Sequence, residues 1–201
     1  MNQKTYTALQ QQWKSNLVAI YEYGMIPIFI LKNSNFIKLE VSKKYLERES
    51  FIILDKDDII NGADIFALKF LHMQHHAKRI IWTPIFEKIK LKKEDVRFTL
   101  EADLRNKLIQ LRESYLSTPK KKKFIESILP AMEPIREGAI VLKNKKLPET
   151  LQEKQELVDK LYDCNWKVFY YDQTDNKTAE NIQGINSYLQ ILCNKINNFT
   201  S

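Results

Sequence analysis

The three histidines of the chain stand together, as His72-Met-Gln-His75-His76. Imidazole binds transition metals and exchanges protons near neutral pH, so this cluster is a candidate for metal binding or acid–base chemistry. No acidic residue or cysteine lies beside it in the sequence. We favour the simpler interpretation, in which the histidines are polar residues where a strand leads into a loop. The sequence therefore predicts no metal site.

A second set of residues that could bind a ligand is basic. Lys120–Lys123 form an unbroken block where a helix is expected to begin, and positive charge there opposes the helix dipole, which suggests phosphate binding. A solvated loop is the favoured alternative, because blocks of like charge are usually exposed. The candidate phosphate or nucleic-acid contacts are Arg97, Arg105, Arg112, Lys120, Lys121, Lys122 and Lys123. Glu101 and Glu113 can neutralise the arginine stripe.

The charge balance of the whole chain is also basic. Its 201 residues include 32 Lys and Arg against 25 Asp and Glu, which gives a net charge of +7. Such a charge permits attraction to nucleic acid, nucleotide phosphates or an acidic protein, and it does not choose among them. Heavy use of Lys, Asn and Ile is the bias of an AT-rich genome, which accounts for part of this charge.

Neither an export signal nor a membrane span is expected. The start MNQKTYTALQQQW has no cationic stretch before an apolar core, and no window approaches about 20 uninterrupted apolar residues. We therefore expect a cytoplasmic protein. The two cysteines, Cys164 and Cys193, show no metal-ligand spacing and are expected to be small core residues.

The first 75 residues alternate β-branched and aromatic runs with segments of helical spacing. Strands are expected at 17–24, 28–31, 51–54 and 64–73, and helices at 5–16, 36–48 and 57–60. Asp55 is expected to cap the short helix with its carboxylate, and Gly62 to end it. This part of the chain predicts a small sheet with helices.

From about residue 94 the apolar spacing becomes helical. Leu100, Leu104, Leu108 and Leu111 recur at three- and four-residue steps, and the helix should stop before Pro119. A second helix is expected to pass Met132, with interruptions at Pro130 and Pro134 and a third piece running to Leu142.

Two further helices are expected near the C-terminus. Thr150 and Glu153 have the spacing of a capping box, which opens a helix through Tyr162. A polar loop at 172–177 precedes a last helix, whose apolar face reads Ile182, Ile185, Leu189, Leu192 and Ile196. The fold class predicted is α+β, with a small mixed sheet and helices followed by an all-α bundle. The domain boundary predicted lies between residues 1–92 and 93–201.

Two segments carry a resemblance to a known family, namely DIFALKFLHM at 64–73 and DLRNKLIQLRESYL at 103–116. They resemble a strand of the type DvFPLEFLDI and a helix of the type ELRxKLLxLRxxYL in bacterial nucleotidyltransferase-domain proteins of the DNA polymerase β-like superfamily. The resemblance covers about residues 50–165. It implies a nucleotidyltransferase-like α/β domain that is followed by a helical domain.

The chain departs from that family at the positions that carry its chemistry. The family uses a Gly-Ser turn for the nucleotide phosphates, and an Asp-x-Asp pair with a third carboxylate for divalent metal. Here the first strand ends in Gly24-Met25, and the following IPIFILKN has no Asp-x-Asp. In the motif that Asp64 opens, Lys69 replaces the family's Glu and His72 its Asp, and an ammonium group repels a metal cation. These positions indicate a degenerate active site.

Other carboxylates could replace the missing ligands. Glu22, Asp55, Asp57 and Asp58 lie in the same region of the chain. Helix capping already explains the last three, so we do not expect a rebuilt metal site.

The sequence thus predicts a catalytically inactive nucleotidyltransferase-like protein, with no cofactor, that acts as a binding or protein-interaction module. One alternative is a nucleotidyltransferase that a partner chain completes. Another is a nucleic-acid-binding module that uses Arg112 and Lys120–Lys123. The leading hypothesis expects a protein partner, and nucleotide or nucleic acid would bind through the basic residues.

Overall fold

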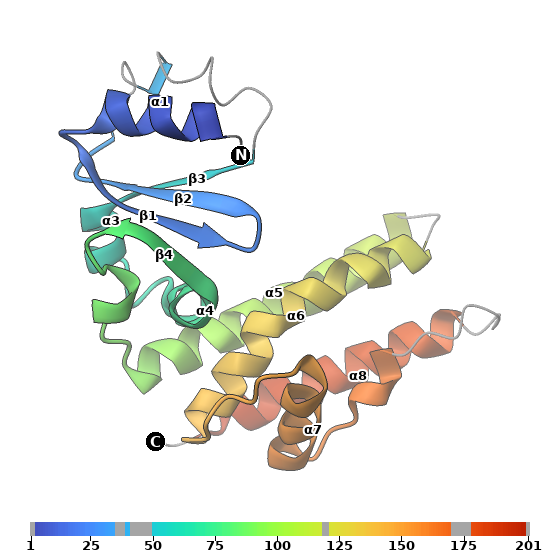
Figure 1. Ribbon diagram of the computed structural model, residues 1–201. Helices are drawn as coiled ribbons and strands as arrows, with labels where there is room; N and C mark the ends of the chain where they lie inside the picture. The colour runs from blue at the N-terminus through green and yellow to red at the C-terminus, as the bar shows by residue number, and fades with distance from the viewer. Residues whose placement is uncertain (1–2, 35–38, 41–49, 118–120, 170–177, 200–201) are drawn as a thin grey trace. The chain divides into compact units, whose positions relative to one another are not determined.

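The computed structural model describes the backbone of residues 3–34, 39–40, 50–117, 121–169 and 178–199, and within these the side chains of residues 3–6, 121–130, 168–169 and 178–179 are not described. The chain divides into two compact units, residues 1–91 and 92–201, which we describe separately as the N-terminal and C-terminal units. The N-terminal unit contains the strands and the C-terminal unit is helical (Figure 1). The predicted fold class is confirmed.

The N-terminal unit is built on a four-stranded mixed sheet. Its strands are β1 (Leu17–Tyr23), β2 (Ile26–Leu31), β3 (Ile52–Asp55) and β4 (Ala77–Trp82), in the order β3-β2-β1-β4. β1 pairs antiparallel with both β2 and β4, whereas β2 and β3 are parallel. The helical elements of this unit are α1 (Gln3–Trp13), α3 (Lys56–Asn61), α4 (Ala67–His76) and the 3-10 turn η1 (Phe86–Lys88).

Both faces of the sheet are covered, which explains why β1 and β2 are almost continuously apolar. On one face α1 packs Leu9 and Trp13 against Ile20 and Phe29. On the other face, α3, α4 and η1 contribute the buried residues Ile59, Phe70, Met73 and Phe86. Figure 1 shows α1 on the opposite side of the sheet from α3 and α4. The central strands therefore supply the core of this unit.

The prediction of a strand at 64–73 is wrong, because α4 occupies most of that segment. Alternating apolar residues suggested a strand. The run from Phe66 to His76 contains no β-branched residue, however, and Ala, Leu, Lys, Met and Gln all favour a helix. The helix buries Ala67, Leu68, Phe70 and Leu71 along one side. Helical propensity and this face outweigh the weaker alternation.

The fourth strand of the sheet is one that sequence reasoning missed. β4 begins with Ala-Lys-Arg and is largely exposed, so it lacks the apolar run of a buried strand. It lies at the edge of the sheet, and its register with β1 shifts between Ile20 and Tyr21, which marks a β-bulge. Charged residues and a bulge protect an edge strand from pairing with other chains.

The other N-terminal predictions have mixed outcomes. The helix at 5–16 and the strands at 17–24, 28–31 and 51–54 are confirmed, with small shifts at their ends. α3 is confirmed too, but Asp55 makes no side-chain capping bond, because its carboxylate accepts from Ser34 instead. The helix predicted at 36–48 lies largely outside the described residues.

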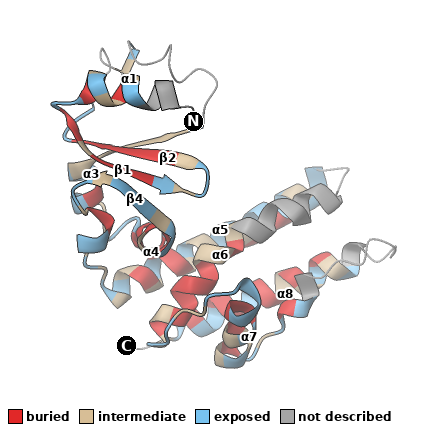
Figure 2. Cartoon of the chain, in the orientation of Figure 1, coloured by how far each residue is buried: buried red, intermediate tan, exposed pale blue. Residues whose placement is uncertain are grey.

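The C-terminal unit consists of α5 (Lys93–Ser117), α6 (Lys121–Leu142), α7 (Leu151–Tyr162), the 3-10 turn η2 (Trp166–Phe169) and α8 (Thr178–Asn197). α5 packs against both α6 and α8, and α6 also packs against α7. Figure 2 shows the buried residues where these helices face one another. The apolar face predicted for the last helix is buried as expected. The loop at 172–177 lies outside the described residues.

α6 is one continuous helix, so the predicted interruptions at Pro130 and Pro134 are wrong. A proline inside a helix costs about 3 kcal/mol because a backbone hydrogen bond is lost. Met132, Ile135 and Ala139 are completely buried on this helix. Burial of that face compensates the cost of the prolines.

No helix among the described residues is both long enough and apolar enough to cross a membrane.

Candidate functional site

The first position to consider is the turn that joins β1 to β2. Tyr23 pairs with Ile26, so the loop consists of Gly24 and Met25 alone. Gly24 has a φ of 61°, in the left-handed region that favours glycine. Glycine at the first of two loop positions is typical of a tight type II′ hairpin. The structure therefore places a closed hairpin where the family resemblance expects a phosphate-binding turn.

The end of β1 lies beside α4. The rings of Tyr23 and His72 are 5.5 Å apart and nearly perpendicular, which brings the Gly24 turn close to His72. Lys69 lies one helical turn before His72 and is exposed. Asp64 belongs to the turn before α4, where its carboxylate accepts a hydrogen bond from the Ile65 backbone. Of the four predicted positions, Gly24 and His72 thus lie near one another.

Two carboxylates of this unit, those of Asp55 and Glu87, have partners in the structure. Asp55 accepts from both the backbone N–H and the hydroxyl of Ser34, at 2.7 and 2.8 Å. Glu87 accepts from the Tyr21 hydroxyl at 2.6 Å and lies 3.4 Å from Arg79. These contacts give both acidic groups structural roles.

Tyr21 is the centre of the second of these networks. Its hydroxyl also accepts from the backbone N–H of Ile85, at 2.7 Å. Burial, together with the hydrogen bond to Glu87, raises the pKa of Tyr21 to about 12. The network ties β1 to the segment that follows β4.

The predicted basic set divides into groups with different surroundings. Arg97 and Arg105 both bind Glu101, at 3.3 and 2.7 Å. The neutralisation that the sequence suggested for Glu101 is therefore confirmed. Lys120 and the side chains of Lys121, Lys122 and Lys123 lie outside the described residues, although the backbone of the last three begins α6.

Arg112 lies at a pocket between α5 and α8, whose volume is about 450 Å³. Its lining residues are Leu111, Arg112, Tyr115, Leu116, Ile182, Gln183 and Asn186. The described residues around it include apolar side chains, amides and one guanidinium group, and no carboxylate. This composition suits an apolar group that carries a negative charge.

A buried charge network links α6 and α7, and sequence reasoning missed it. Lys154 lies 2.5 Å from Glu137 and 3.1 Å from Glu133. Burial alone would lower the pKa of Lys154, but the two glutamates outweigh it and the pKa is raised. The sequence held one signal, since Glu137 directly precedes the apolar end of α6, Gly138 to Leu142.

Arg136 is the second buried charge of α6. It is only 1% exposed, and its guanidinium lies 3.9 Å from the centre of the Trp166 ring. A guanidinium over an indole face is a favourable cation–π contact. The contact attaches η2 to α6.

Cys164 lies near this cluster and is half-buried, whereas Cys193 is buried as expected. The Cys164 sulfur lies 3.6 Å from the Asp159 carboxylate, which also accepts from the Trp166 backbone at 2.7 Å. Burial raises the pKa of Cys164 to about 12, so this thiol is a poor nucleophile at neutral pH. The cluster is structural.

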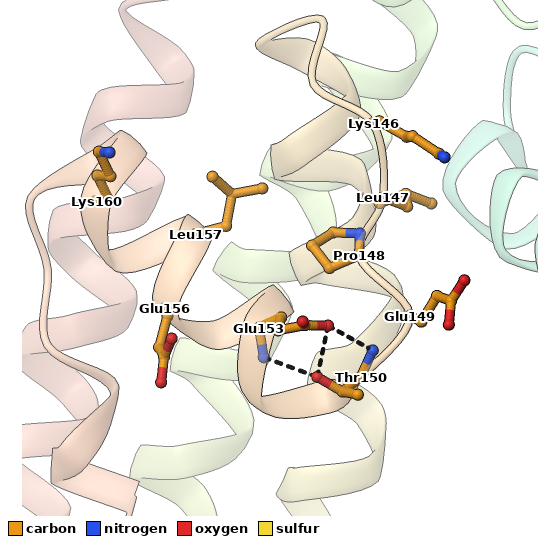
Figure 3. Close-up of a pocket in the computed structure, with 9 residues that line it drawn as sticks. All are labelled: Lys146, Leu147, Pro148, Glu149, Thr150, Glu153, Glu156, Leu157 and Lys160. Carbon is orange, nitrogen blue, oxygen red and sulfur yellow. Dashed lines mark hydrogen bonds between the residues drawn. The ribbon is translucent and has the colours of Figure 1, made fainter.

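A larger, open pocket of about 600 Å³ lies where the loop after α6 enters α7. Figure 3 shows that Thr150 and Glu153 bind each other there, which confirms the predicted capping box. Lys146 and Lys160 lie on opposite sides of the group, with Glu149 on the side of Lys146 and Glu156 on the side of Lys160. Charges of both signs around an open surface do not select one class of ligand.

The chain matches no family model, no curated protein and no solved structure. The nucleotidyltransferase likeness therefore stays a prediction from the two sequence segments.

Proposed function

We propose that this protein is a nucleotidyltransferase-like module that binds a protein partner and transfers no nucleotide itself. The closed hairpin at Gly24 and Met25 is the observation that carries the proposal. Phosphates are bound by successive unpaired backbone N–H groups in a loop. A two-residue hairpin between paired strands offers too few of these for a triphosphate.

The surroundings of the hairpin support the same function. Lys69 places an exposed ammonium group on α4, at the position that the family resemblance assigns to a metal-binding glutamate. Asp55, one of the candidate replacement ligands, accepts a hydrogen bond from Ser34 instead. The chemistry of nucleotide transfer thus lacks both its phosphate turn and its cation ligands at these positions.

The α5–α8 pocket is the surface that favours a protein partner. Leu111 and Ile182 form buried walls, whereas Leu116 is 85% exposed. Arg112 adds a positive group, and the whole chain carries a charge of +7. Charge complementarity therefore selects an acidic segment that inserts an apolar side chain and sets a carboxylate on Arg112.

A transfer assay tests the catalytic part of the proposal. Purified protein is incubated with each labelled nucleoside triphosphate and magnesium or manganese, and release of labelled pyrophosphate or incorporation of label is measured. We expect no turnover above the buffer control. Metal-dependent turnover that Asp64→Asn abolishes would show an active enzyme and would overturn the proposal.

A peptide selection tests the binding part. A random peptide library is selected on the full chain, and the selected peptides are measured against Arg112→Ala and Arg105→Ala. Both arginines are exposed on α5, but Arg105 binds Glu101 rather than lining the pocket. We expect the selected peptides to combine acidic and apolar residues. Their affinity should fall about tenfold with Arg112→Ala, because one charge-assisted hydrogen bond is lost, and should not change with Arg105→Ala. Equal effects of the two variants would contradict this site.

The nucleic-acid alternative uses Arg112 and Lys120–Lys123, and it gains no help from the other two candidate arginines, Arg97 and Arg105, because Glu101 binds both. Electrostatic binding to nucleic acid weakens steeply as the salt concentration rises. Tight binding to DNA or RNA whose affinity falls between low and physiological salt would therefore favour this alternative over our proposal. The alternative of an enzyme completed by a partner chain predicts that the complex transfers nucleotides while the isolated chain is inert.

A further inference from the structure

Two histidines lie one helical turn apart on α4 and face each other. The ring centres of His72 and His76 are 4.4 Å apart. One ring nitrogen of each lies within 4.8 Å of the other. Residues four apart in a helix share a face, so the backbone of α4 holds the pair in this arrangement.

The ring of His72 is held by its surroundings, whereas the ring of His76 is accessible to solvent. His72 is 7% exposed and its ring packs edge-on against Tyr23 of β1. His76 is exposed near the C-terminal end of the helix. A ligand can therefore reach the pair from solvent while its inner imidazole is already oriented.

This geometry matches the needs of a transition metal. Two histidines four residues apart on a helix are an established way to hold zinc, with zinc–nitrogen distances of about 2.0–2.1 Å. At tetrahedral angles such nitrogens are roughly 3.3 Å apart. A rotation of the exposed His76 side chain closes the remaining distance without movement of the backbone.

We propose that His72 and His76 chelate a divalent transition metal, of which Zn²⁺ is the representative, with water completing its coordination. Imidazole nitrogen suits zinc, copper and nickel, whereas magnesium and calcium require oxygen ligands. The chelate lies within the N-terminal unit and is independent of the proposed loss of nucleotide transfer. It departs from our expectation from the sequence that these histidines bind no metal, and the zinc titration below decides between the two.

His75 provides a matched control on the same helix. It directly precedes His76 and is also exposed, but its side chain points about 100° away around the helix axis. Substitution of either residue removes one exposed imidazole. Only the loss of His76 removes a ligand of the proposed chelate.

Isothermal titration of the untagged full-length protein with zinc chloride tests the proposal. We expect one zinc ion per chain, a loss of about tenfold or more in affinity with His76→Asn, and an unchanged affinity with His75→Asn. Equal affinities in the wild type and His76→Asn, or no binding at millimolar zinc, would overturn the chelate.

A competition experiment identifies the ligand type without any substitution. Excess magnesium should leave the zinc titration unchanged, because imidazole nitrogen does not favour magnesium. Displacement of zinc by magnesium would point to oxygen ligands elsewhere and would also contradict the proposal. His72→Asn, checked for folding by circular dichroism, should weaken zinc binding as His76→Asn does.

Discussion

Gly24 adopts a left-handed backbone conformation in the loop between two paired strands. A Cβ atom added there would meet nothing within 4 Å, so only the backbone conformation opposes a side chain. We predict that Gly24→Ala lowers the free energy of unfolding by about 1 kcal/mol. Urea denaturation measures the change.

Met25 is the natural control for that substitution. It occupies the other position of the hairpin loop and is 92% exposed. Met25→Ala should change the free energy of unfolding by less than about 0.5 kcal/mol, as is usual for surface substitutions. Similar costs for the two variants would show that the conformation of Gly24 does not matter.

Tyr21 predicts a particular loss of stability at alkaline pH. Its pKa rises from 10.0 in the unfolded chain to about 12 in the fold, chiefly through burial. A raised pKa means that its contribution is complete below pH 10 and is lost as the pH rises through 12. After screening by solvent, this loss should be about 1 to 2 kcal/mol.

The variant Tyr21→Phe isolates this contribution. It should be less stable than the wild type at pH 8, because Glu87 and the Ile85 backbone lose a hydrogen-bond partner. Between pH 10 and 12, however, its stability should fall less steeply. Urea denaturation across this range gives both slopes, and parallel slopes would mean that Tyr21 titrates normally in the fold.

At the scale of elements, the Lys154 network links α7 to α6 through a buried ion pair. Lys154 is 3% exposed and Glu137 is completely buried. Removal of one partner from a buried ion pair leaves an uncompensated charge, which costs about 3 kcal/mol or more. We predict this loss for Lys154→Met, measured by chemical denaturation.

Lys160 lies on the same helix and is exposed, so Lys160→Met should be close to neutral. The double variant Lys154→Met with Glu137→Gln should recover part of the loss, because the buried carboxylate is then neutral. A double variant that is less stable than Lys154→Met would show that Glu137 does not depend on this lysine.

Periodicity predicted the elements whose apolar pattern has one interpretation. α5 and α8 were found in this way, whereas β1 and β2 were found from their apolar runs and the capping box from the spacing of Thr150 and Glu153. Periodicity failed for α4, where alternation and helical spacing competed over a short segment. It also failed for β4, because an exposed edge strand has no apolar face to detect. The local preference of proline predicts a break in α6, but burial of the apolar face in the folded unit keeps the helix continuous. That burial is not visible in the local sequence.

The sequence predicted less of the sites than of the fold. The replacement of the family's Gly-Ser turn by Gly24-Met25 was visible in the sequence, and the structure has a two-residue hairpin at that position. The Tyr23–His72 contact and the Arg136–Trp166 contact join distant segments of the chain. Distances of this kind arise only from the folded arrangement of elements.

At the scale of the whole molecule, we propose that the fold does not serve nucleotide transfer. Its net charge of +7 would attract nucleotides weakly at any surface, so attraction alone does not decide the claim. A site that recognises the triphosphate and its metal must instead show magnesium-dependent binding. The N-terminal unit contains the closed hairpin, where we expect no nucleotide to bind. The C-terminal unit contains the pocket at Arg112, where we expect acidic peptides to bind.

The most direct test is thermal unfolding of the purified chain in the presence of ATP, GTP, CTP or UTP, with and without magnesium. A ligand at about 100 times its dissociation constant stabilises the folded state by about 2.7 kcal/mol, which raises the melting temperature by several degrees. We predict no magnesium-dependent shift with any of the four nucleotides. A reproducible rise that requires magnesium would reveal a nucleotide site and would contradict the account.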